Sequence, residues 1–180
     1  HFKTKMKSTK EFFQNKKILI YGYGKTGKSA FNFLKTKNNL KVFDDNLPLT
    51  NLPYNKKFTR GSDRVRNFDY VLLSPGINYR KCLLSNEIIK NKEKIISDLD
   101  VFYKSFPENF FITITGTNGK STTTKFIEQS LSDCKNKVFS CGNIGIPFGE
   151  VIKKVTSKDS LVVETSSFQL DKIIDLKFDI

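Results

Sequence analysis

The sequence predicts a parallel α/β fold, arranged as two consecutive units. Short apolar segments typical of strands alternate with amphipathic segments typical of helices along most of the chain. Glycine-containing turns follow two of the apolar segments, at residues 22–27 and 116–119. Between the two series lies the segment SFPENF, residues 105–110, which has the proline and polar residues of a linker. With 180 residues, the chain is long enough for one large domain or two small ones.

The first unit begins with an expected strand at residues 16–22, KKILIYG, which ends in glycine. Its other expected elements are a helix at 25–37, strands at 40–45 and 68–74, a helix at 82–90, and a short strand turning into a helix at 94–105. This alternation predicts a Rossmann-like parallel sheet domain over residues 1–106.

The second unit opens with an expected strand at 110–116, FFITITG. It continues with a helix at 120–132, a strand at 137–142, a helix around 147–154 and a strand at 160–166. The final residues, LKFDI, resemble the start of one more strand. Because three strands are few for a covered parallel sheet, we expect residues 107–180 to be the first part of a truncated domain and the chain to be a fragment.

Composition narrows the classes of protein. No apolar run approaches the roughly 20 residues of a membrane span, and the first ten residues lack the apolar core of a secretory signal. Three distant cysteines, Cys82, Cys134 and Cys141, suit neither a disulfide framework nor a zinc site, which favours a reducing cytoplasm. The one histidine is His1, so a histidine-based catalytic centre within this chain is excluded.

The formal net charge of +13 makes nucleic-acid binding an alternative. However, the lysines are spread over the whole chain, and arginine, the preferred base reader, occurs only at positions 60, 64, 66 and 80. We therefore interpret most lysines as a solvated surface, some of which favour a polyanionic small substrate. The predicted partners include no nucleic acid and no membrane.

A G-x-G-x-x-G motif follows the first expected strand and consists of Gly22, Gly24 and Gly27. Such glycines let the backbone turn tightly and approach a phosphate, whose charge the helix N-terminus favours. Two acids, Asp44 and Asp45, end the second strand about twenty residues later, where a carboxylate can accept hydrogen bonds from a ribose or a base. The third strand ends in Ser74, Pro75 and Gly76 at the same predicted edge. Nucleotide binding and a ligand-free packing turn are both open readings of the motif alone.

The second motif, TGTNGKST, follows the strand at 110–116, and its loop is two residues shorter than the usual G-x-x-x-x-G-K-[ST]. Backbone amides from Thr117 to Ser121 could ring a phosphate, Lys120 could contact terminal phosphates, and Ser121 could ligate Mg²⁺. A simple helix-capping turn with Thr117 or Asn118 as the cap is the alternative. The later strand LVVE ends in Glu164, where a metal-binding carboxylate would stand, and GNIG places Asn143 between glycines after another strand.

In order and spacing, TGTNGKST, GNIGIPF and VVETSSFQL resemble the Mur ligases of peptidoglycan synthesis. In the first unit, GYGKTGKS, VFDD and SPGI resemble the uridine-nucleotide domain of that family, and the resemblance extends from about residue 15. It implies a P-loop NTPase-like central domain after the Rossmann-like domain. SSFQL implies the branch that adds D-glutamate to UDP-N-acetylmuramoyl-L-alanine, with ATP and Mg²⁺ as cofactors, through an acyl phosphate.

The resemblance also implies roles for individual residues. The residues implied to bind ATP are Gly116, Thr117, Asn118, Gly119, Lys120, Ser121 and Thr122. Those implied to bind the UDP-linked substrate are Gly24, Lys25, Thr26, Asp44, Asp45, Asn46, Ser74, Pro75, Gly76, Asn143, Ser166 and Gln169. Ser121 and Glu164 would hold the metal ion, and Lys120, Glu164 and Asn143 would serve catalysis. We expect the whole protein to be a cytoplasmic monomer. The present chain, as a fragment of it, should be inactive alone, although residues 1–105 could still bind the uridine nucleotide.

Three alternatives stay open at this point. Another Mur-type ligase or a folylpolyglutamate ligase shares the short TNGK loop, although Ser121 and SSFQL favour the branch named above. An oxidoreductase that binds NAD through the first glycine motif would leave residues 110–170 unexplained. A basic α/β module for nucleic acid would show strongly salt-dependent binding.

Overall fold

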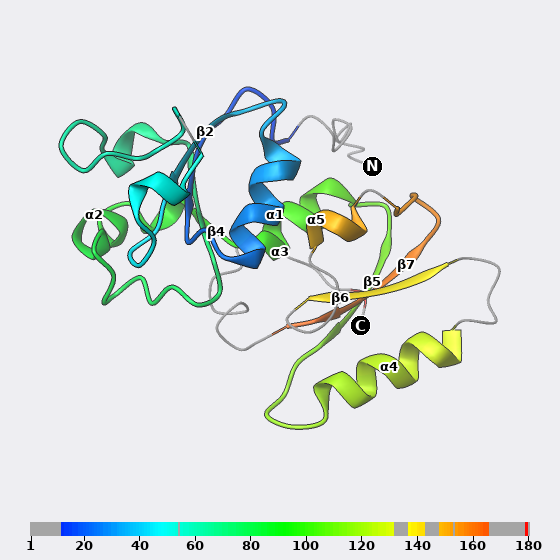
Figure 1. Cartoon of the computed structure of the whole chain (residues 1–180). Coiled ribbons are helices and arrows are strands. Elements are labelled where there is room, and N and C mark those ends of the chain that lie inside the picture. The colour runs from blue at the N-terminus through cyan, green and yellow to red at the C-terminus, as the bar shows by residue number, and fades with distance from the viewer. Residues whose placement is uncertain are drawn as a thin grey trace, which may run out of the picture.

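The computed structural model describes residues 12–53, 55–131, 137–142, 148–152, 154–165 and 179. These residues form two parallel β-sheets that carry helices on their faces (Figure 1). The prediction of a parallel α/β fold in two successive series is therefore confirmed. No helix within these ranges is long and apolar enough to cross a membrane.

The first sheet has four parallel strands in the order β2-β1-β3-β4. Its elements are β1 (Lys17–Tyr21), α1 (Lys25–Leu34), β2 (Asn39–Phe43), β3 (Tyr70–Leu73), α2 (Ser85–Ile89), β4 (Ile95–Ile96) and α3 (Asp98–Ser105), with short 3-10 turns at Leu49–Asn51, Val65–Asn67 and Lys92–Lys94. Each lies within about four residues of the predicted element. The strands of this sheet are largely apolar because both of its faces are covered.

Alternate residues of these strands enter two separate cores. Leu19, Tyr21 and Leu73 pack with Ile88 of α2 on one face. Ile18, Ile20 and Leu72 form the other core, together with Ala30 and Leu34 of α1. This two-residue alternation is the ordinary consequence of strand geometry. Because the strands are parallel, their carboxyl ends meet at one common edge.

The second sheet has three parallel strands in the order β5-β7-β6. Its elements are β5 (Phe110–Ile114), α4 (Lys120–Leu131), β6 (Val138–Gly142), α5 (Phe148–Val151) and β7 (Ser160–Glu164). Figure 1 shows α4 on one face of this sheet and α5 on the other. On the free side of β5, the amide of Asp179 donates to the Phe111 carbonyl oxygen at 3.2 Å. The rest of the final segment LKFDI lies outside the described residues, so a further strand there stays a prediction.

Helix α3 contributes to both units. Its Val101 lies in the core of the first sheet, whereas Leu99 and Phe102 lie in the core of the second. Ser97 and Asp100 form a capping box at its N-terminus, in which each side chain accepts a hydrogen bond from the backbone amide of the other residue. The helix is thus a fixed packing element, and the division at residues 106 and 107 stays a prediction.

The predicted linker at 105–110 is packed, not loose. The ring of Phe106 lies 5.4 Å from that of Phe102, between centroids. Asn109 is buried, and its amide group donates to the carbonyl oxygens of Thr156 and Asp159, at 2.7 Å each. Proline and polar residues at this position therefore mark a tight, hydrogen-bonded connection.

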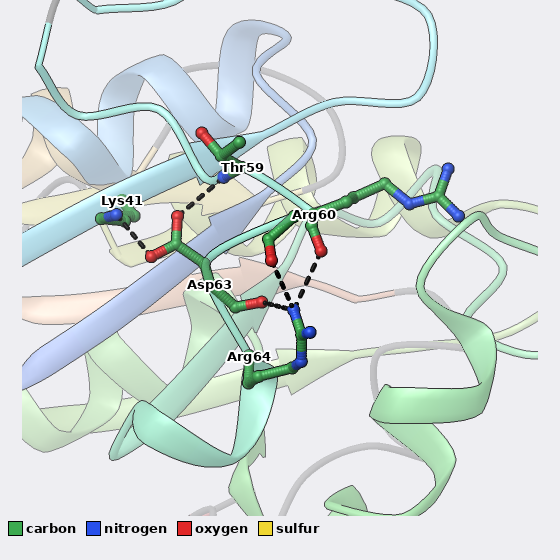
Figure 2. A network of polar contacts seen from close by, with 6 residues as sticks. Lys41, Thr59, Arg60, Asp63 and Arg64 are labelled. Carbon is green, nitrogen blue, oxygen red and sulfur yellow. Dashed lines mark hydrogen bonds and ion pairs between the residues drawn. The ribbon is translucent and has the colours of Figure 1, made fainter.

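Between β2 and β3 the chain makes an excursion at residues 55–68, part of which runs parallel to β2 at the edge of the first sheet. Lys57 forms a parallel bridge with Val42, and the Phe58 amide donates to the Val42 carbonyl oxygen at 2.9 Å. Farther along, Asp63 accepts hydrogen bonds from the Lys41 ammonium and from the Thr59 amide (Figure 2). The Arg64 guanidinium donates to the carbonyl oxygens of Arg60 and Asp63 in the same turn. These contacts hold the excursion against β2.

Candidate active site

The structure brings the sequence-predicted residues of the first unit to one edge of the first sheet. The loop 22–27 follows β1, Asp44 and Asp45 follow β2, and Ser74 to Gly76 follow β3. Direct contacts join these three segments, since the Tyr23 amide donates to Asp44 and the Ser74 hydroxyl donates to the Gly22 carbonyl oxygen. This carboxyl edge is where open parallel sheets bind ligands.

The glycines at this edge fall into two groups. Gly22 has φ +94°, and a Cβ on Gly27 would lie 1.9 Å from the Gly22 carbonyl oxygen, so the fold itself requires both. Gly24 and Gly76 are exposed, and no described atom would lie within 4 Å of a Cβ on either. Packing therefore explains the first pair, whereas the second pair leaves open space where a ligand could approach.

The two adjacent acids have different partners. Asp44 accepts from three backbone amides, those of Tyr23 at 2.7 Å, Asn46 at 2.9 Å and Leu47 at 3.1 Å. Asp45 accepts from the Tyr21 hydroxyl and from the Leu83 amide. Asp44 thus braces the glycine loop, and Asp45 connects the end of β2 to the segment before α2.

The other residues predicted to bind the nucleotide at this edge include exposed side chains and one that lines a small cavity. Lys25 is exposed at the first position of α1, and the Asn46 side chain is exposed after β2. Thr26 lines a cavity of about 20 Å³ between α1, α3 and α5, which is large enough for one water molecule but not for a nucleotide. A nucleotide would therefore lie over the open edge and not in this cavity.

The second glycine loop joins β5 to α4. Gly116 has φ +146° and Gly119 has φ +77°, so both adopt backbone conformations that favour glycine. Residues 115–119 are exposed, and the first turn of α4 leaves backbone amides without intrahelical partners. The Lys120 ammonium donates to the carbonyl oxygens of Gly116 at 2.6 Å and Thr117 at 3.3 Å. This arrangement presents amides and a lysine on one exposed loop.

Glu164 lies at the end of β7 beside this loop. The Ser121 hydroxyl donates to its Oε2 at 3.1 Å, and Glu164 is only 1% exposed. Its Oε1 is buried and accepts no hydrogen bond from the described residues. A buried carboxylate oxygen without a donor is costly, and a cation is the natural partner for it.

These residues fit a magnesium ion. Ser121 and Glu164 offer a hydroxyl and a carboxylate oxygen, which are hard ligands of the kind that Mg²⁺ prefers. Within the described part of the chain, no group of three histidine, cysteine, aspartate or glutamate side chains could hold a metal alone. A pair of protein ligands suits Mg²⁺ that is also bound by nucleotide phosphates and water.

Gly142 explains how β6 contributes to this arrangement. It has φ +125°, and a Cβ there would lie 2.1 Å from the Glu164 carbonyl oxygen. The close approach of β6 to the end of β7 therefore requires glycine. Asn143, Ser166 and Gln169, which the sequence placed at the substrate, lie outside the described residues.

One residue of the first edge was missed by sequence reasoning. Tyr21 is fully buried at the end of β1, and its hydroxyl donates to Asp45. Burial and the hydrogen bond to Asp45 raise the pKa of Tyr21 well above its ordinary value. The only signal in the sequence was a tyrosine as the last residue of an otherwise aliphatic strand.

Comparison with known proteins tests the resemblance. Residues 114–180 match the model of the Mur ligase middle domain, which starts at the last residue of β5 and includes the loop with Lys120. Curated relatives align over about nine tenths of the chain, and therefore over both sheets. The chain belongs to the Mur ligase family. The region that matches the family model contains the second glycine loop, at residues 116–119, and not the first.

Three relatives show the extent of the similarity. A protein of Leuconostoc citreum is 31% identical over 93% of this chain, one of Rickettsia bellii is 37% identical over 87%, and one of Rickettsia prowazekii is 38% identical over 89%. Each bears the name UDP-N-acetylmuramoylalanine–D-glutamate ligase. This chain spans 39%, 35% and 36% of the length of these relatives, respectively.

Proposed function

We propose that the chain forms part of an ATP-dependent ligase that adds D-glutamate to UDP-N-acetylmuramoyl-L-alanine in peptidoglycan biosynthesis. The observation that carries this proposal is the buried Glu164 carboxylate, with one oxygen unpaired among the described residues, beside Ser121 and the lysine loop. The names of the relatives supply the substrates, because a phosphate-binding loop alone does not choose between ligations.

In this proposal the second loop binds ATP. The backbone amides of residues 116–122 surround the phosphates, and Lys120 exchanges its loop carbonyls for phosphate oxygens. Ser121 and Glu164 hold Mg²⁺, which would neutralise charge on the β- and γ-phosphates when bound. The Glu164 oxygen that has no donor among the described residues supports this role, because a cation would give it a partner.

The first edge binds the uridine nucleotide. The open space at Gly24 and Gly76 would admit the phosphates or a ring of the nucleotide, while Asp44 keeps the glycine loop in place. Lys25, Thr26, Asp45, Asn46, Ser74 and Pro75 complete the proposed set. The Ser74 hydroxyl already donates to Gly22, so it could only accept a hydrogen bond from the ligand.

The proposed reaction has two steps. The substrate carboxylate attacks the γ-phosphorus of ATP, which forms an acyl phosphate and releases ADP. The amine of D-glutamate then attacks the acyl carbon, loses a proton and displaces inorganic phosphate. No protein nucleophile is required, and the loop with Lys120 would lower the repulsion between two anions that must meet. Asn143, Ser166 and Gln169 are proposed to orient the muramoyl end.

The proposed enzyme is a monomer of the bacterial cytoplasm, where ATP is available, and has no nucleic-acid or membrane partner. Elution of the full-length protein as a dimer would contradict the first point. Salt-dependent capture of oligonucleotides with an affinity above that for UDP would contradict the exclusion of nucleic acid.

A coupled assay of phosphate release tests the proposal. The full-length protein should release phosphate from ATP only when UDP-N-acetylmuramoyl-L-alanine and D-glutamate are both present. The Lys120→Ala variant should lose about 10²-fold or more in kcat, as for the loss of one transition-state contact. Preference for a folate or another amino acid would favour a different ligase, and tight NAD binding would favour an oxidoreductase.

A further inference from the structure

A buried tyrosine hydroxyl lies directly beneath the carboxyl edge of the first sheet. Tyr21 is the last residue of β1, is fully buried, and packs edge-on against Phe43 with ring centroids 5.2 Å apart. Its hydroxyl donates to Asp45 Oδ1 at 2.5 Å. The raised pKa of Tyr21 keeps this hydroxyl protonated, and therefore a donor, throughout the neutral range.

Asp45 extends this contact to a third segment of the chain. Its Oδ2 accepts from the Leu83 amide at 3.3 Å, and the Leu84 amide donates to the Tyr21 oxygen at 3.4 Å. Cys82 and Leu84 are buried in the core that contains Tyr21. The ends of β1 and β2 and the segment before α2 thus meet in one hydrogen-bonded cluster, which we call the Tyr21 cluster.

The Tyr21 cluster leaves Asp45 with room for a ligand. A carboxylate has about four acceptor positions, and the structure shows one donor on each oxygen of Asp45. Asp44, in contrast, accepts two amides on Oδ1 and a third on Oδ2. Asp45 is half-buried and fixed in direction, so its remaining acceptor positions point in a defined direction.

We propose that Tyr21 is a positioning residue of the uridine-nucleotide site. Its hydroxyl fixes the Asp45 carboxylate, and with it the segment before α2, in the orientation that the ligand requires. The inference rests on the proposed function of this edge, but not on the chemistry at the second loop. Tyr21 itself is fully buried and does not touch the ligand.

Titration of the full-length protein with UDP tests the proposal. The Tyr21→Phe variant removes only the hydroxyl, so the Kd for UDP should rise about tenfold, as expected for a lost hydrogen bond to a charged group. Its Kd for ATP should stay within twofold. Tyr70→Phe is the matched control, since Tyr70 starts β3 at the opposite edge of the same sheet, and it should leave both values unchanged.

A double-mutant cycle separates positioning from a general structural effect. If Tyr21 acts through Asp45, the Tyr21→Phe/Asp45→Asn protein should bind UDP no more than twofold more weakly than Asp45→Asn alone. The proposal would be overturned if the losses of UDP affinity in the two single variants multiplied in the double variant. It would also be overturned by an unchanged Kd for UDP in Tyr21→Phe.

Two further outcomes are decisive. If Tyr21→Phe fails to fold, an unchanged Kd for UDP in Asp45→Asn still overturns the inference, and a weakened Kd supports it. If the unaltered protein does not bind UDP, the proposed function of this edge fails, and the inference fails with it.

Discussion

The two glycine loops occupy corresponding places in the two sheets, yet their glycines are required for different reasons. In the first loop, Gly22 and Gly27 are dictated by contacts with neighbouring backbone and with Ser74. In the second loop, Gly116 and Gly119 have positive φ, but no described atom lies closer than 3.7 Å to a Cβ placed on either. The first loop is therefore held by packing, and the second by its own backbone conformation.

The acids beside the loops differ in the same way. Asp44 and Asp45 accept hydrogen bonds on both oxygens, from a hydroxyl and four backbone amides in total. Glu164 has one oxygen paired with Ser121 and another without a donor in the described part of the chain. Each carboxylate oxygen of the first edge thus has a protein donor, whereas one Glu164 oxygen has none among the described residues and could accept a cation. Substitutions at the two places should consequently fail in different ways.

The largest effect is expected for Gly27→Ala. A Cβ at this position would meet the Gly22 carbonyl oxygen at 1.9 Å, and backbone cannot move aside as a side chain can. The free energy of unfolding should fall by about 3 kcal/mol or more, measured by chemical denaturation. Gly61→Ala, where no described atom lies within 4 Å, should change it by less than about 0.5 kcal/mol. Equal stability of the two variants would break the comparison.

A smaller, ligand-dependent effect is expected for Glu164→Gln. Without ligand this variant should be at least as stable as the unaltered protein, because it removes a buried charge, one oxygen of which has no donor among the described residues. At a Mg-ATP concentration of about 100 times Kd, the unaltered protein should gain about 2.7 kcal/mol and the variant much less.

Thermal unfolding with and without Mg-ATP measures this difference. Glu128→Gln is the matched control, because Glu128 also accepts from a serine hydroxyl, that of Ser140, but lies farther along α4. It should keep the full gain. An equal gain in Glu164→Gln would show that Glu164 does not hold the metal.

The smallest effect concerns Asp63, remote from both loops. Burial alone would raise the pKa of Asp63, but the Lys41 ammonium and the Thr59 amide outweigh it, so the pKa lies below its ordinary 3.8. A lowered pKa stabilises the fold above pH 3.8, and this contribution is lost as the pH falls through and below that value.

Asp63→Asn should therefore remove less than about 1 kcal/mol at neutral pH, because Lys41 is partly exposed, and should flatten the pH dependence below 3.8. Denaturation at several pH values measures both. The affinities for UDP and ATP should not change. A change in either would contradict the prediction, because it would couple residues 55–68 to a nucleotide site.

The elements of both sheets were predictable because their strands are apolar runs that end in, or are soon followed by, glycine, serine or an acidic residue. The packing of α3 was not predictable, because Leu99, Val101 and Phe102 are all apolar and the sequence does not indicate which sheet each one packs against. The packing of the segment at 105–110 was not predictable either, because the buried Asn109 donates to Thr156 and Asp159, which lie 47 and 50 positions away.

The candidate site was predictable in its location but not in its contacts. The motifs and their spacing predicted one site for Lys120, Ser121 and Glu164, and in the structure the Ser121 hydroxyl donates a hydrogen bond to Glu164. The identical chemistry of Asp44 and Asp45 concealed their different partners, which depend on how Tyr21 and Leu83 pack. The roles of both acids, and of the other site residues, stay predictions.

The most direct test of the division between the two loops is a paired titration of the full-length protein with UDP and Mg-ATP. Lys120→Ala should weaken ATP binding at least tenfold and leave UDP binding within twofold. Gly76→Val fills space that is open in the structure, so it should weaken UDP binding at least tenfold and leave ATP binding unchanged. If either variant weakened both nucleotides equally, or weakened the wrong one, the two loops would not be separate nucleotide sites.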